Sequence, residues 1–152
     1  MKQSLVRTLW IALIIGVFGA CGDSDPASPD PDPDPDPDPD PRMVLANPAF
    51  GANIQEIFDR RGCTASNCHG ASPGQAMLNL SSGVAHGQLV GVTSSQAAPL
   101  VRVVAGDADA SYLIMKLLGT GQQGQMPQGG APLDMIDMDN IRNWINTGAA
   151  NN

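Results

Sequence analysis

The chain has 152 residues, of which only 4% are aromatic, and its formal net charge is −7 at pH 7. Eight of its fifteen acidic residues lie between Asp23 and Asp40, whereas residues 42–152 carry six basic and seven acidic side chains. The part that is long enough to form a core is therefore nearly neutral, which excludes the basic surface of a nucleic-acid-binding protein and makes the low pI uninformative about partners.

Residues 1–20 have the pattern of an export signal. Lys2 and Arg7 form a basic start, and the apolar run from Leu9 to Ala20 is shorter than the roughly twenty residues that a membrane-spanning helix needs. The run ends in FGAC, which resembles the lipobox of bacterial lipoproteins, where cleavage leaves the cysteine as a lipid-bearing N-terminus. We therefore expect a lipid on Cys21 that tethers the protein to a membrane; an ordinary signal peptide is the alternative.

Residues 21–42 are predicted to form a disordered stalk behind that cysteine. Pro alternates with Asp from Pro29 to Pro41, so this segment has no apolar face and few backbone donors. The composition favours an extended polyproline-type conformation, and some twenty residues at about 3.1 Å each would reach roughly 60 Å. The stalk would hold one folded domain, residues 43–152, away from the membrane; an acidic binding tail is the alternative.

A short helix is predicted from Asn53 to Arg61. Asn53 is the expected N-cap, Glu56 stands at the third position of a capping box, and Gly62 is a typical helix end. One face of this helix is apolar and is expected to be buried: Ile54, Ile57 and Phe58.

Cys63, Cys68 and His69 follow that helix at once, in the stretch GCTASNCHG. Two thiols followed by an imidazole form the pattern that attaches a haem, in which each Cys binds one vinyl group and the His is an axial ligand. The usual motif has two residues between the cysteines and this one has four, so the loop must bulge. A Cys63–Cys68 disulfide is the alternative, whereas zinc needs about four ligands and the loop offers three.

Between Gly70 and Gly106 the pattern is weak, and we expect loops with one short helix. A second clear helix is predicted from Ala110 to Leu118, with Asp109 as its cap and Gly119 as its end. No segment shows sustained period-two alternation, so we expect an all-α domain of three to four short helices.

The last predicted helix has the strongest signals. Asp134 is its expected cap, and Leu133 and Met138 form the expected hydrophobic staple. Its apolar stripe continues through Ile141, Trp144 and Ile145. Trp144 is expected to pack this helix against the first one, near the edge of the haem.

A haem held by His69 needs a ligand on its other face, and Met126 is the leading candidate. It stands in the flexible loop GQQGQMP, where no helical periodicity would bury it, and Pro127 restricts the backbone beside it. A thioether favours reduced iron and so raises the potential. Other candidates are most simply core residues of helices or surface residues of loops: Met77, Met115, Met135, Met138 and His86.

The end of the chain resembles the distal-Met loop and last helix of small class I c-type cytochromes. MPQGGAPL at 126–133 is followed by Ile141, WI at 144–145 and GA at 148–149, an order similar to that in haem-binding domains of exported bacterial proteins. GDADASYL at 106–113 also matches the segment before the Met loop of those domains. The resemblance covers most of the chain after the stalk.

By that resemblance, Cys63 and Cys68 form the two thioethers of one haem c, His69 is the proximal ligand and Met126 is the distal ligand. The widened cysteine spacing departs from the family, and it bears on which maturation machinery accepts the chain. Arg102 is a candidate partner of a haem propionate, because a charge-assisted pair there would be partly buried; a solvated Arg is the alternative.

With both axial positions filled by protein, the iron can exchange electrons but has no open site for a substrate. We therefore predict a membrane-tethered electron carrier, not an enzyme, with redox proteins as partners, on the periplasmic side of a bacterial membrane or at the cell surface. Gly22 favours the outer membrane, because it is not a residue that retains lipoproteins in the inner one. The alternatives are a haem peroxidase or small-molecule sensor with a weak distal bond, and a haem-free structural lipoprotein. No bound nucleotide is expected. Residues 119–124 match the GxGxxG pattern of a dinucleotide-binding loop, but they follow a predicted helix and not a strand.

Overall fold

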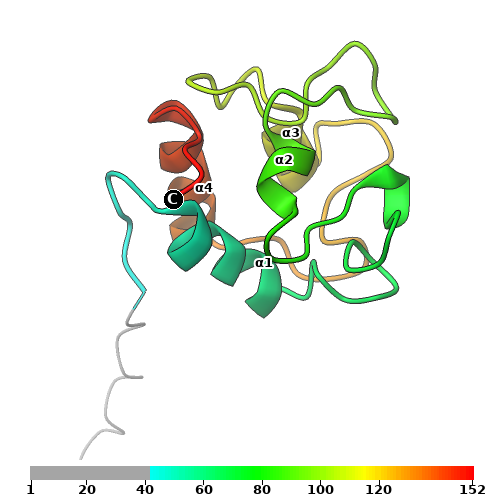
Figure 1. Cartoon of the computed structure of the whole chain (residues 1–152), viewed down its shortest axis with the longest axis horizontal. Helices are drawn as coiled ribbons and strands as arrows, with labels where there is room; N and C mark the ends of the chain where they lie inside the picture. The colour runs from blue at the N-terminus through cyan, green and yellow to red at the C-terminus, as the bar shows by residue number, and fades with distance from the viewer. Residues whose placement is uncertain (1–41) are drawn as a thin grey trace, which may run out of the picture. The chain divides into compact units, whose positions relative to one another are not determined.

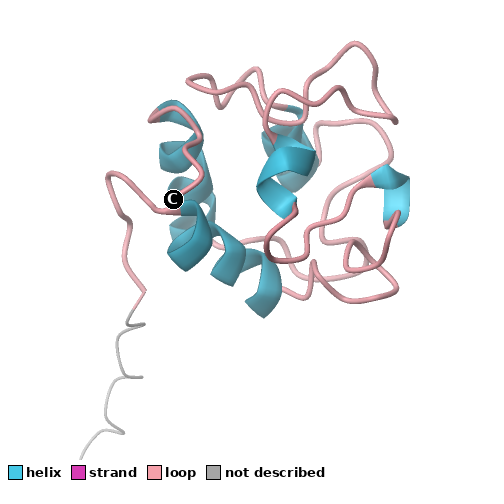
Figure 2. Cartoon of the chain, in the orientation of Figure 1, coloured by secondary structure: helices cyan, strands magenta, loops and turns pink. Residues whose placement is uncertain are grey.

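Helices joined by long loops make up residues 42–152, the part of the chain that the computed structural model describes (Figure 1). Pairing between extended segments of this part is limited to three isolated β-bridges (Figure 2), so the predicted helical class is confirmed. The predicted signal peptide, Cys21 and the Asp-Pro stalk up to residue 41 lie outside the described residues. No helix within 42–152 has the length and apolarity that crossing a bilayer requires.

The first helix begins earlier than the sequence pattern predicts. A π-helical turn, η1 (Phe50–Ile54), leads directly into α1 (Gln55–Arg60). The predicted cap is therefore wrong: Asn53 lies inside the helical segment, and its Oδ1 accepts a hydrogen bond from the backbone N–H of Ala49 at 2.8 Å. The predicted end is confirmed, because Gly62 follows the helix with a φ of +71°, a conformation that suits glycine.

A contact with Asn152 accounts for the early start. The Oδ1 of Asn152 accepts a hydrogen bond from Phe50 N at 2.9 Å, and its backbone oxygen accepts one from Gly51 N at 2.8 Å. These acceptors satisfy N–H groups that the first turn of a helix cannot satisfy by itself. Glu56, the predicted capping-box residue, instead forms an ion pair with Arg60 at 2.7 Å.

The middle of the chain is mostly loop, as predicted. It contains a single 3-10 turn, η2 (Gln75–Met77), and one short helix, α2 (Ala85–Leu89). Ala85 and Leu89 bury the inner side of α2 in the core.

The third helix, α3 (Tyr112–Leu118), starts two residues later than predicted. Its N-cap position is Ser111, and Asp109, the predicted cap, forms an ion pair with Arg142 at 2.7 Å instead. Gly119 ends the helix in the left-handed conformation, with a φ of +76°, as predicted.

The last helix, α4 (Met135–Asn146), begins where the sequence pattern places it. Asp134 is its N-cap and accepts a hydrogen bond from the backbone N–H of Asp137 at 3.0 Å. That bond, with help from Arg42, lowers the pKa of the Asp134 carboxyl below its usual value, so the cap is charged at neutral pH. Leu133 and Met138, the predicted staple, both pack against the core.

One part of the core lies where the first helical segment packs against α4 (Figure 1). Trp144 is fully buried there, with its ring centroid 5.1 Å from that of Phe50, and its Nε1 donates to Ala150 O at 2.9 Å. The predicted packing of Trp144 between the first and last helices is therefore confirmed. The ring of His86 in α2 is T-shaped to that of Phe50, with the two ring centroids 5.1 Å apart.

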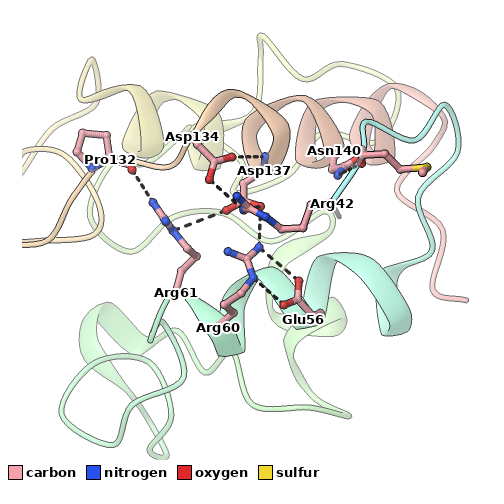
Figure 3. Close-up of polar contacts among 9 residues, drawn as sticks. Arg42, Glu56, Arg60, Arg61, Pro132, Asp134, Asp137 and Asn140 are labelled. Carbon is pink, nitrogen blue, oxygen red and sulfur yellow. Dashed lines mark hydrogen bonds and ion pairs between the residues drawn. The ribbon is translucent and has the colours of Figure 1, made fainter. Parts of the chain in front are cut away.

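Next to this crossing, a buried carboxylate joins α1 to α4 (Figure 3). The side chain of Asp137 is 1% exposed, and its Oδ1 accepts hydrogen bonds from Arg60 at 2.7 Å and from Arg42 at 3.0 Å. Its Oδ2 accepts no hydrogen bond within 42–152 and faces Arg61 Nε at 3.7 Å. Arg61 also donates to the backbone oxygen of Pro132, so this group connects the end of the first helix to the segment before α4.

Candidate functional site

One cavity of about 500 Å³ brings together the five candidate site residues of the described part. They come from three stretches of chain that are distant in sequence: Cys63, Cys68 and His69 from one loop, Arg102, and Met126. The volume lies within the range of about 300–1,000 Å³ that is common for cofactor sites. Much of the remaining wall is apolar: Phe58, Leu78, Leu80, Leu89, Leu113 and Leu117.

The loop between the two cysteines folds into a closed turn. Cys63 O accepts a hydrogen bond from His69 N at 3.0 Å, and Ala65 O accepts one from Cys68 N at 2.9 Å. The extra residues of the widened motif are thus absorbed in a turn, while the imidazole-bearing residue remains bonded to the first cysteine. Gly70 is required behind this turn, because a Cβ there would lie 1.8 Å from Thr64 O.

Both thiols of this loop are free and half-buried. Burial raises the pKa of Cys63 to about 11, with a further contribution from Cys68, so its thiol is neutral at physiological pH. A neutral thiol is a weaker metal ligand and a weaker nucleophile than the thiolate. Within residues 42–152, no group of three or more His, Cys, Asp and Glu side chains is arranged to bind a metal ion.

The ring of His69 is held by two backbone carbonyls. Its Nδ1 lies 3.1 Å from Gln75 O and 3.3 Å from Leu78 O. Because a carbonyl oxygen only accepts, Nδ1 carries the proton, and in the neutral ring the lone pair available to a metal is on Nε2. Such an outer hydrogen bond is what orients a metal-ligating histidine in proteins.

Met126 is half-buried and packs against the core, although no helical periodicity of the sequence predicts its burial. Its backbone N–H donates to Lys116 O at 2.9 Å. Two side chains of α3 also bind the loop before it: Lys116 Nζ donates to Gln122 O at 3.0 Å and to Gly124 O at 2.7 Å, and Tyr112 Oη donates to Gln122 O at 3.1 Å. The sequence pattern places Lys116 and Tyr112 on the helix before the loop, but it does not indicate these contacts.

Arg102 is buried, being only 7% exposed, so the alternative of a solvated arginine is wrong. Its guanidinium donates to three backbone oxygens, Gln88 O at 2.9 Å, Met77 O at 3.0 Å and Ala76 O at 3.2 Å. It forms no ion pair with a carboxylate of residues 42–152, and burial lowers its pKa. The cavity wall therefore contains a cation whose charge no described acid neutralises.

The other candidate ligands are not part of the cavity wall. His86 is half-buried in α2, not on a surface loop, and its Nε2 lies 2.8 Å from Ala149 O. Met77 is 66% exposed, and Met135 is 80% exposed at the start of α4, so the predicted core position of Met135 is wrong. Trp144 is also not part of the cavity wall, although we expected it near the edge of the haem.

Comparison with known proteins adds no relative to this description. Searches against protein-family models, curated proteins and solved structures each found no match for the chain.

Proposed function

We propose that the chain is a monohaem c-type cytochrome that carries single electrons. The observation that carries this proposal is the convergence of Cys63, Cys68, His69 and Met126 on one cavity. One haem c needs two thiols for covalent attachment, and an imidazole and a thioether for His/Met ligation, and these four residues supply that set. Their convergence was not imposed by proximity in the sequence, because Met126 is 57 residues from His69.

The cavity suits this cofactor in size and in chemistry. Its wall is largely apolar, as a porphyrin face requires, and Arg102, a buried cation with no carboxylate partner in residues 42–152, can face a propionate. When bound, the haem supplies an iron that gains and loses one electron. The thioethers form by addition of each S–H across one vinyl group, so sulfur bonds to one carbon and hydrogen to its neighbour without any external oxidant.

The chain's own residues would set the properties of this centre. Gln75 O and Leu78 O hold the His69 ring with Nε2 available, and the soft thioether of Met126 favours the reduced state. The apolar wall keeps water away and so also raises the potential. With both axial positions taken by protein, the centre would serve electron transfer and not substrate turnover.

We further propose that a lipid on Cys21 and the Asp-Pro stalk hold this electron carrier at a membrane. A lipid on Cys21 would hold the chain at a bacterial membrane on the periplasmic side or at the cell surface, and the Asp-Pro segment would let the domain reach redox protein partners. These features rest on the sequence patterns of residues 1–42 alone.

A reduced-minus-oxidised spectrum with pyridine treatment, together with intact mass, tests the proposal on the mature protein made in a host that matures c-type cytochromes. We expect the added mass of one haem and the blue-shifted α band of a haem whose vinyl groups are saturated. Replacing both Cys63 and Cys68 by Ala should abolish covalent haem completely, because no other thiol lies in the cavity wall.

Cys21→Ser is the matched control for that variant, because it removes the remaining cysteine. It should lose the lipid mass and keep the haem. A colourless wild-type product whose Cys63 and Cys68 thiols are still titratable would refute the haem and favour the haem-free lipoprotein.

A further inference from the structure

Lys116 is a charged group in the cavity wall that neither axial ligation nor covalent attachment uses. It lies in α3, is only 7% exposed, and is one of just two lysines in the chain, the other being Lys2. Burial lowers the pKa of its ammonium. Within residues 42–152 it forms no ion pair with a carboxylate, so the cost of burying this charge must be offset by other contacts.

Those contacts all go to the loop that bears Met126. The Nζ donates to Gln122 O at 3.0 Å and to Gly124 O at 2.7 Å, and the backbone oxygen of Lys116 accepts from Met126 N at 2.9 Å. Hydrogen bonds from an ionised donor are roughly twice as strong as neutral ones. One residue thus fixes the loop at three points, two of them through a side chain that no neutral residue of similar length could replace.

The packing of the loop on α3 agrees with this role. A Cβ at Gly121 would lie 3.3 Å from Lys116 Cδ and 3.2 Å from Tyr112 Cε2, so the loop backbone lies directly on the lysine stem. Gln125 adds a further bond, from its Nε2 to Leu117 O at 2.9 Å. The segment from Gly121 to Met126 is therefore bonded to α3 at several points, and the ammonium binds its middle.

We propose that Lys116 is the positioning residue of the distal ligand: its ammonium holds the Gln122–Met126 loop on α3 and thereby keeps the Met126 thioether on the haem iron. This inference rests on the proposed function, since it concerns how strongly the sulfur is held. Without the two bonds from Nζ, the loop can leave α3 and the thioether dissociates for part of the time. The iron then becomes open to external ligands although Met126 itself is intact.

The test uses the haem-loaded protein with Lys116→Met, which keeps the apolar stem and removes the donors. We expect unchanged haem content, since Cys63, Cys68 and His69 are intact, a ferric sulfur-to-iron charge-transfer band that is at least twofold weaker, and carbon monoxide binding at least tenfold faster. Hydrogen exchange at the amides of Gly121 and Met126, which donate to α3, should also speed up by about tenfold or more. Lys116→Arg, which retains charge and donors, should restore part of the band.

Arg142→Met is the matched control, because it removes one cation from a surface ion pair with Asp109, and it should leave the band and the carbon monoxide rate unchanged. If Lys116→Met retains the full band and the wild-type carbon monoxide rate, the role of Lys116 is refuted while the cytochrome proposal stands. If the wild-type protein carries no haem or shows no such band, the proposed function fails instead. Should Lys116→Met not fold, Lys116→Leu, which also lacks a donor, carries the same test, and a full band in that variant overturns the inference.

Discussion

Replacing Met126 by Ala is expected to leave the haem attached, to lower its reduction potential by roughly 0.1 V or more, and to open the ferrous iron to carbon monoxide. Attachment is unaffected because Cys63, Cys68 and His69 lie in a separate loop that closes on itself. The potential falls because the thioether that favours reduced iron is lost, and axial ligands span about 0.8 V in haem proteins. Potentiometric titration and carbon monoxide difference spectra measure the two effects.

Met138→Ala is the matched control for this experiment. Met138 is also a half-buried methionine that packs on the core, but it is not part of the cavity wall. The control should cost some stability and leave the potential and the carbon monoxide spectrum unchanged. An unaltered spectrum and potential in Met126→Ala would rule out Met126 as the ligand, and carbon monoxide binding by the unmodified protein would instead favour the peroxidase or sensor.

Signals that act within one turn of a helix were predicted correctly from the sequence. Asp134 caps α4 by bonding an N–H three residues away, and Gly62 and Gly119 end their helices through conformations that other residues rarely adopt. Each depends on neighbours along the chain, so no tertiary information is needed. The candidate cavity residues were also found from the sequence, because the Cys–His motif and the Met-Pro segment carry their chemistry in local patterns.

Features that depend on distant partners were missed. Asn53 and Asp109 have the residue types of caps, yet the first helix begins earlier because Asn152 satisfies its N–H groups, and Asp109 is engaged by Arg142. The hydrogen bonds from Lys116 to the loop before Met126 were likewise not predicted, because a lysine in an amphipathic helix usually reaches solvent. A sequence pattern records what a side chain is able to do, whereas the fold decides which partner it meets.

Asp137→Asn is expected to destabilise the domain by about 3 kcal/mol, measured by chemical denaturation of the haem-loaded protein at neutral pH. The carboxylate is fully buried and is the common partner of three guanidinium groups, those of Arg42, Arg60 and Arg61 (Figure 3). An amide of the same shape leaves them without that charge. We take the low end of the range for breaking a buried pair, because the three arginine side chains are 21–32% exposed and water partly solvates them.

Asp109→Asn makes the same chemical change at an exposed ion pair and should cost no more than about 1 kcal/mol. Its carboxylate is 87% exposed and pairs with Arg142 at 2.7 Å. Asp137, in contrast, pairs with Arg61, which lines the cavity and also donates to Pro132 O. Loss of Asp137 should therefore loosen two parts of the site at once, the loop of Cys63 and the segment after Met126. Equal destabilisation by the two variants would mean that the arginine group contributes no more than a surface ion pair, and that the helix crossing alone holds the cavity together.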